Sequence, residues 1–187
     1  MKTICFTGHR PDKLGGYNWH TSKNQRIMKA LRSKIIEVIN NTDSNVKDFR
    51  FICGGALGID QMAFEICYEL KYSELKLNGC RIELELAIPF DKQASKWFSK
   101  TDIDRFYRHQ QLSDIITFVD LMEGYEFKGV PKGEYHPAKM QIRNRYMCDN
   151  SEAIIAVWNG SKGGTANCVN YAKKQGKEII VINPDEI

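Results

Sequence analysis

The stretch FICGGALGID, residues 51–60, reads as a buried strand that turns through glycines into a helix. The first N–H groups of a helix have no partner within it, and with the positive end of the helix dipole they attract phosphate or carboxylate. Glycine suits such a turn because it accepts positive φ and lets a ligand approach the backbone. We therefore predict an anion site at Gly54, Gly55, Ala56 and Gly58, with a purely structural turn as the alternative.

Length and composition favour one ordinary globular domain. The chain has 187 residues, of which 42% are hydrophobic and 27% charged, as is typical of a globular domain with a sizeable core. The net charge of +4 favours an anionic ligand but does not by itself imply nucleic-acid binding. No apolar run has the length of a membrane span, and Met1-Lys2 leads directly into a strand-like run, so we expect no signal peptide and a cytoplasmic protein.

The six cysteines show no metal-binding or disulfide pattern. They are scattered, without a CxxC pair or a histidine at ligand spacing: Cys5, Cys53, Cys67, Cys80, Cys148 and Cys168. We expect buried free thiols and no metal site.

Apolar patterns along the rest of the chain alternate between strand and helix. Strands are predicted at residues 4–7, 81–89, 114–119, 153–158 and 178–182, and helices at 22–41, at 137–149 and after residue 165. Ser22 and Gln25 have the spacing of a capping box. The Gly- and aromatic-rich segment 120–136 is expected to be a lid or binding loop. The alternation predicts an α/β fold over residues 1–187: a single-domain, Rossmann-like three-layer sandwich with a mainly parallel sheet.

Three polar or glycine-rich turns follow predicted strands. They are Gly8-His9-Arg10, residues 54–58, and the run from Gly160 to Thr165 that includes Gly163 and Gly164. Ligands of open parallel sheets bind beyond the carboxyl ends of the strands, so we expect these turns to meet over one site. The middle turn lacks the dinucleotide fingerprint because Cys53 stands where GxGxxG needs glycine, which disfavours a routine NAD dehydrogenase.

Arg143 is the most informative single residue. On the predicted helix 137–149, Met140, Arg143 and Met147 share one face. A guanidinium on an inward stripe needs an anionic partner, either a ligand phosphate or carboxylate or an internal Asp or Glu.

Three further polar residues lie at the predicted turns. Arg10 is either a second anion-binding residue or an exposed loop arginine. His9 is an acid/base group, a ribose contact or a hydrogen-bonding spacer. Asp60 either accepts a bond from a ribose hydroxyl or complements the helix dipole.

Aromatic and acidic side chains give weaker candidates. Trp158 and Tyr125 are candidates for stacking on a base, with core or lid packing as the alternative. Glu123 and Glu134 are candidate catalytic carboxylates, although acidic residues in a polar loop are usually solvated.

The ordered set TGHRP, GGALGID, MQIRNRYM and WNGSKGGT resembles the YpsA branch of the SLOG superfamily, Rossmann-like proteins that include DprA and the LOG phosphoribohydrolases. The resemblance covers nearly the whole chain. It implies phosphate at the glycine loops, places Arg143 where LOG enzymes have an active-site arginine, and puts Asn144 where they have a lysine. Cys168 stands where LOG enzymes have a glutamate.

These features lead to one functional hypothesis and two alternatives. We expect a sensor or regulator of bacterial or phage origin that binds a small nucleotide or nucleotide-derived ligand, such as a nucleoside monophosphate or an ADP-ribose- or NAD-like molecule, and that needs no other cofactor. A hydrolase or transferase acting on a nucleoside N-glycosidic bond is the alternative enzyme. Single-stranded DNA binding is the least expected, because no basic aromatic stripe is evident. A homodimer is expected by analogy with related folds.

Overall fold

A computed structural model describes residues 1–73 and 79–187. Within them, six parallel strands form one sheet in the order β4-β3-β2-β1-β5-β6. Their bounds are Lys2–Gly8 (β1), Asp48–Cys53 (β2), Arg81–Ile88 (β3), Ile115–Phe118 (β4), Ala153–Val157 (β5) and Glu178–Ile182 (β6). The predicted parallel sheet is confirmed. The predicted strand ends lie within two residues of the observed ones, except that β2 begins three residues before the Phe51–Cys53 stretch.

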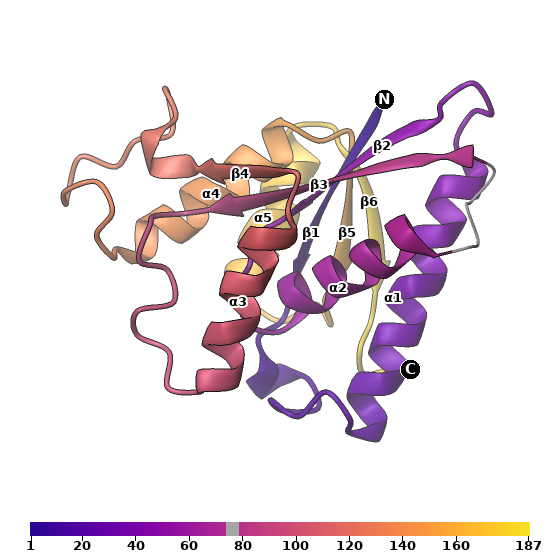
Figure 1. Ribbon diagram of the computed structural model, residues 1–187, viewed down its shortest axis with the longest axis horizontal. Helices are drawn as coiled ribbons and strands as arrows, with labels where there is room; N and C mark the ends of the chain where they lie inside the picture. Colours follow the sequence, from indigo (N-terminus) through magenta and orange to yellow (C-terminus); the bar gives the residue numbers. More distant parts are fainter. Residues whose placement is uncertain (74–78) are drawn as a thin grey trace.

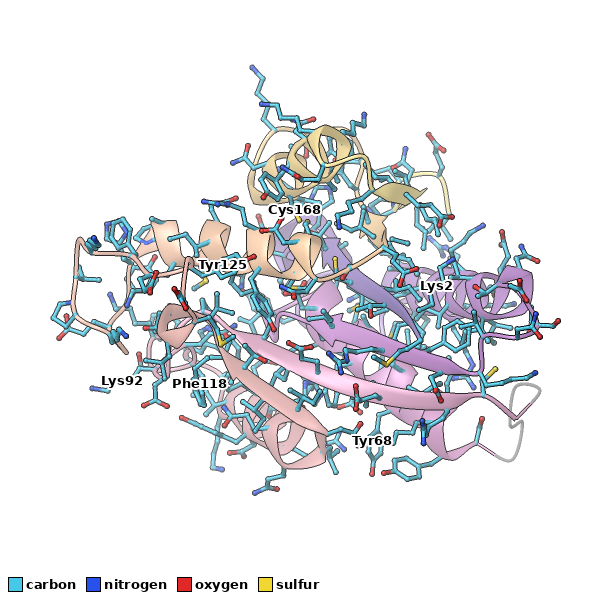
Figure 2. The ribbon with its side chains drawn as sticks, turned by 90° about the horizontal axis from the view of Figure 1, so that it is seen from above. Lys2, Tyr68, Lys92, Phe118, Tyr125 and Cys168 are labelled. Carbon is cyan, nitrogen blue, oxygen red and sulfur yellow. The ribbon has the colours of Figure 1, made fainter. Side chains whose placement is uncertain are left out.

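Helices cover both faces of this sheet. They are α1 (Ser22–Asn41), α2 (Ile59–Tyr72), α3 (Lys100–Leu112), α4 (Pro137–Asp149) and α5 (Gly164–Lys174), with short 3₁₀ helices η1 (Pro11–Lys13) and η3 (Val119–Leu121). In Figures 1 and 2, α1, α2 and α3 lie on one side of the sheet and α4 and α5 on the other. The fold is therefore a Rossmann-like three-layer sandwich, as predicted.

Strand alternation explains why two cores form. Along β1, Ile4 and Phe6 point into the core beneath α1 and α2, whereas Cys5 points into the core beneath α4 and α5. Successive side chains of a strand face opposite sides, so a strand covered on both faces is apolar throughout. Phe6 stacks on Phe51 of β2 with ring centroids 5.8 Å apart. Burying such a side chain stabilises the fold by about 1.5–3 kcal/mol.

The N-cap of α1 differs from the predicted one by one residue. Thr21 is the N-cap, and its hydroxyl accepts a hydrogen bond from the backbone N–H of Asn24. The predicted capping box of Ser22 and Gln25 is wrong, because the Gln25 amide donates instead to the carbonyl of Trp19. The predicted apolar face of α1, which includes Ile27, Leu31 and Ile35, is fully buried.

Segment 120–136 begins within η3 and continues as the predicted loop, and a buried ion pair holds its start to α4. The Nζ atom of Lys139 lies 3.1 Å from the Oδ2 atom of Asp120, and both side chains are buried. Lys139 also donates to the carbonyl of Pro131, and Asp120 accepts from the backbone N–H of Gly133. Lys139 thus holds the segment to α4 at two points, and the bond between Gly133 and Asp120 closes the segment on itself.

The strand order reverses between β1 and β5. The chain runs outward from β1 to β4 and then returns to place β5 against the other side of β1 (Figure 1). Such a switch point leaves a crevice beyond the carboxyl ends of the two strands, where ligands of doubly wound proteins bind. In the described residues, no helix is both apolar and long enough to span a bilayer.

Candidate functional site

A cavity of about 270 Å³ lies at this switch point. Three parts of the chain line it: the end of β1 with the segment after it, the start of α2, and the facing parts of α4 and the α5 loop. The lining residues are Thr7, Gly8, His9, Arg10, Asp12, Lys13, Ala56, Asp60, Met140, Gln141, Arg143, Asn144, Ser161, Lys162, Gly163, Gly164 and Thr165. The first and third predicted turns therefore meet at one site.

Two glycines allow the end of β1 to approach the start of α2. A Cβ atom at Gly8 would lie 2.5 Å from the Cβ atom of Ile59, and one at Gly58 would lie 2.5 Å from the carbonyl oxygen of His9. Gly58 also has φ +95°, a conformation that side chains disfavour. This contact places Asp60, in the first turn of α2, beside the β1 turn.

Arg143 and Asp60 form the buried charged centre of the cavity. The Nη2 atom of Arg143 lies 3.5 Å from the Oδ2 atom of Asp60, and both residues are buried. The Nη1 atom donates to the carbonyl of Gly54, and Nε donates to the side-chain oxygen of Asn144. Arg143 thus has an internal carboxylate partner, which was the predicted alternative, and it also lines the cavity.

Burial acts on both charges of this pair. It raises the pKa of Asp60, while the nearby Arg143 and Arg10 guanidinium groups oppose that rise. Burial lowers the pKa of Arg143, and Asp60 opposes that fall. Arginine nevertheless stays protonated at any physiological pH, so the centre always presents a cation.

His9 holds the β1 turn to the loop after β5. Its Nε2 atom lies 2.8 Å from the side-chain oxygen of Asn159, and the Asn159 amide nitrogen donates to Asp185 at 2.7 Å. The backbone N–H of Asn159 also points to Nε2 of His9, at 3.3 Å, so the tautomer of the ring decides which of the two contacts is the stronger hydrogen bond. His9 is buried and lines the cavity, so it connects two of the elements that form the site.

The loop from residue 159 to 163 closes the other side. Lys13 donates from Nζ to the Ser161 hydroxyl at 3.1 Å, and the Trp158 indole donates to the Ser161 carbonyl. The α5 helix begins at Gly164, and no side chain caps its N-terminus. Its first N–H groups therefore have no partner within the helix, and their end of the helix carries the positive dipole.

Residues 4–187 match the family described as the YspA SLOG family, YpsA. The chain belongs to this family. It is 39% identical over 166 residues to the SPbeta prophage-derived protein YoqJ of Bacillus subtilis, covering 87% of this chain and 92% of YoqJ. It is 28% identical over 181 residues to a UPF0398 protein of Bacillus cereus, covering 95% of this chain and 85% of that protein.

Solved structures with the same fold include two DprA proteins. The YspA-family chain superposes on DprA of Streptococcus pneumoniae with a TM-score of 0.58 and 16% identity, over 97% of this chain and 50% of that one. DprA of Helicobacter pylori, described for its single-stranded DNA binding mode, gives a TM-score of 0.54 and 15% identity over 97% and 65%. The YspA-family chain thus spans half to two thirds of these proteins, and the likeness establishes the fold.

The middle turn of this YspA-family chain shapes the cavity more than it lines it. Gly54 and Gly55, like Gly58, are absent from the lining, whereas Ala56 is present. A Cβ atom at Gly54 would overlap the Arg143 guanidinium and the Asp60 carboxylate, and one at Gly55 would lie 2.9 Å from the ring of Phe106. The prediction that these three glycines touch the ligand therefore has no support from their placement, because each is packed against protein atoms.

Four other predicted candidates lie outside the lining. Trp158 braces the 159–163 loop through its indole N–H, and Tyr125 donates its hydroxyl to Asp149 and packs edge-on against Tyr146. Figure 2 shows Tyr125 beside α4. Glu123 and Glu134 are exposed residues of the 120–136 loop.

Sequence reasoning missed several lining residues of the YspA-family cavity. These are Thr7, Asp12, Lys13, Met140 as a liner, Gln141, Ser161 and Lys162. Lys13 follows TGHRP by two residues and Lys162 lies inside WNGSKGGT. Both lysines lie within or just after a turn that was predicted to bind an anion. That position was the signal by which the sequence could have identified them.

Proposed function

We propose that this protein binds a phosphate-bearing small molecule of the nucleotide class in the cavity between β1, α2, α4 and α5, and that it acts as a sensor or regulator. The observation that carries the proposal is the convergence of four cationic side chains on one small cavity: Arg10, Lys13, Arg143 and Lys162. The unpartnered N–H groups at the start of α5 add to this positive potential. Within residues 1–73 and 79–187, two carboxylates, Asp12 and Asp60, line the same space.

The size and lining of the cavity favour a phosphate and sugar rather than a whole dinucleotide. Its volume of about 270 Å³ lies at the small end of ligand pockets. Among the residues that the structure describes, no Phe, Tyr or Trp lines it, so the part of the ligand that it encloses is recognised by charge and hydrogen bonds. Trp158 and Tyr125 are correspondingly left out of the proposed base contacts.

The test is a ligand panel measured by thermal shift and calorimetry. AMP, ADP-ribose, NAD and cyclic nucleotides are compared with unphosphorylated adenosine, which we expect not to bind. Arg10→Gln removes an exposed cation of the cavity and should weaken AMP about tenfold, or about 1.4 kcal/mol. Lys174→Gln, which removes the same charge from the far end of α5, should leave the affinity unchanged. Equal weakening by both variants, or equal binding of adenosine and AMP, would refute the proposal.

An N-glycosidic hydrolase or transferase is the second candidate, because buried Asp60 places a carboxylate of raised pKa inside the cavity. A carboxyl group whose pKa is raised keeps its proton to higher pH, which is the property a general acid needs. Chromatography of the incubated nucleotides distinguishes the two: release of free base that disappears in Asp60→Asn favours the enzyme, and binding without turnover favours the sensor.

Single-stranded DNA is the third candidate and is favoured by the DprA fold. The DprA protein of H. pylori is described as binding single-stranded DNA, which weighs against our expectation that nucleic acid is not a partner. Phosphate contacts along a strand produce a steep loss of affinity with salt. Titration of a labelled oligonucleotide at several salt concentrations tests this candidate, and competition by AMP would place the strand in the same cavity.

A further inference from the structure

Asp60 is an unexpected residue in a cavity otherwise suited to anions. It lines the cavity, it is 7% exposed, and its Oδ2 atom makes only long contacts, at 3.5 Å to Arg143 and 3.4 Å to the backbone N–H of Ala56. Within residues 1–73 and 79–187, its Oδ1 atom makes no hydrogen bond. A buried carboxylate normally has its oxygens satisfied, so this one is available to a ligand.

Asp60 is surrounded by charged and titratable groups, so the charge of its carboxylate affects the binding of an anion in the cavity. Arg143 of α4 and Arg10 of the β1 turn attract it, and the Cys53 thiol at the end of β2 lies within electrostatic range. His9, Asp12, Lys13 and Lys162 are the other titratable groups that line the cavity. A ligand anion placed on Arg143 therefore lies next to a negative carboxylate, and like charges at that range repel strongly in a poorly solvated site.

Two events relieve this repulsion. The carboxylate accepts a hydrogen bond from a ligand hydroxyl that lies beside the anionic group, or it takes up a proton from solvent. An anion without a hydroxyl has only the second route. A phosphate ester of a sugar has the first route and keeps Asp60 ionised.

We propose that Asp60 is the specificity-determining residue of the cavity, and that it selects phosphate esters carrying a neighbouring hydroxyl over bare anions, which bind only with uptake of a proton. This inference rests on the proposed function of the cavity and states its ligand class more narrowly: phosphorylated sugars and nucleotides with a free sugar hydroxyl.

The first experiment measures proton uptake with sulfate, an anion that does not itself titrate between pH 5.5 and 8. Calorimetry at constant ionic strength, in buffers of different ionisation enthalpy, should give about one proton taken up per sulfate bound by the wild type near pH 7.5. Affinity should fall about tenfold for each pH unit above the pKa of Asp60. Asp60→Asn should bind sulfate at least tenfold more tightly at pH 7.5 and take up no proton.

The control variant is His9→Asn, because the His9 imidazole also lines the cavity and is the other proton acceptor to be tested. It should retain the uptake of one proton. If the uptake disappears in His9→Asn and persists in Asp60→Asn, the inference is overturned.

The second experiment compares ribose 5-phosphate with methyl phosphate, which carries the same anionic group without a hydroxyl. At pH 7.5 the wild type should prefer ribose 5-phosphate at least tenfold, and Asp60→Asn should prefer it less than threefold. Equal affinities in the wild type would overturn the inference while leaving the anion site intact. Failure of all these anions and of AMP to bind would instead refute the proposed function itself.

Discussion

At the scale of single residues, Gly58 controls how closely two elements meet. Gly58 has a positive φ, and the carbonyl oxygen of His9 occupies the space that a side chain at this position would need. Gly160 has a similar φ of +85° but open space around it. A substitution at Gly160 therefore tests backbone strain alone, whereas one at Gly58 tests strain together with steric overlap.

We predict that Gly58→Ala destabilises the protein more than Gly160→Ala does. Strain at positive φ costs on the order of 1–3 kcal/mol, and Gly58→Ala adds displacement of the β1 turn from α2. Chemical denaturation of both variants and the wild type gives the free energies of unfolding. A loss in Gly58→Ala no greater than in Gly160→Ala would show that the two elements are free to move apart.

The sequence predicted that Arg143 points inward and needs an anionic partner, but it did not predict which residues surround it. Helical spacing shows that the side chain points inward, because Met147 is on the same face and is buried as expected. Spacing does not show which carboxylate meets it, and Asp60 lies on another helix. Nor does it show that Gly54 and Gly55 face protein rather than ligand, because only the packed position of Phe106 and Arg143 decides that.

At the scale of elements, α4 is unusual because its inward face carries two cations. Lys139 and Arg143 lie one turn apart, and both are buried. Each meets a carboxylate of another element: Asp120 of η3 and Asp60 of α2. Tyr146, also on this face, donates to Glu85 of β3. Sequence analysis identifies the buried face of a helix by its apolar residues, and here part of that face is cationic. The pairing of Lys139 with Asp120 was therefore not predicted.

We predict that Asp120→Ala costs about 3–5 kcal/mol, because it leaves a buried ammonium group without its counter-ion. The matched control is Asp104→Ala, which breaks the exposed pair with Lys100 on α3 and should cost less than about 1 kcal/mol. Urea denaturation measures both. A similar small loss in the two variants would show that the Asp120–Lys139 pair is accessible to water.

At the scale of the whole molecule, the alternation of apolar strands and helices was enough to predict the parallel three-layer sandwich. Pairing order is harder to predict, because β5 joins β1 across about 150 residues, as the contact between His9 and Asn159 illustrates. The rule that ligands lie beyond strand carboxyl ends led us to expect the first and third turns at one site, and both line the same cavity. The same rule did not show that the glycines of the middle turn, at the same edge of the sheet, pack against protein instead of lining the cavity.

A buried histidine should make the stability of the whole fold depend on pH. His109 of α3 donates to Glu65 of α2 at 2.7 Å and stacks on Phe64. Burial lowers the pKa of His109 despite the opposing effect of Glu65. Below the ordinary histidine pKa of about 6.5, the unfolded chain then binds a proton that the folded protein does not.

We therefore predict that the free energy of unfolding falls as pH drops below about 6.5, by at most about 1.4 kcal/mol per pH unit for this group. His109→Gln should reduce that slope, whereas His20→Gln, at an exposed position, should not. Urea denaturation at pH 7.5, 6.5 and 5.5 makes the comparison. An unchanged slope in His109→Gln would assign the acid sensitivity to other groups.

The reversal of strand order at β1 has a consequence for how the protein is made. The ribosome makes Gly8 to Lys13 well before it makes Arg143 and the 159–165 loop, although all of them line one cavity. Until β5 is released, one edge of β1 has no neighbouring strand and no complete pocket exists. A nascent chain therefore carries the β1 turn without the Arg143 and α5 walls of the cavity, and the cavity forms only when these later segments fold against β1.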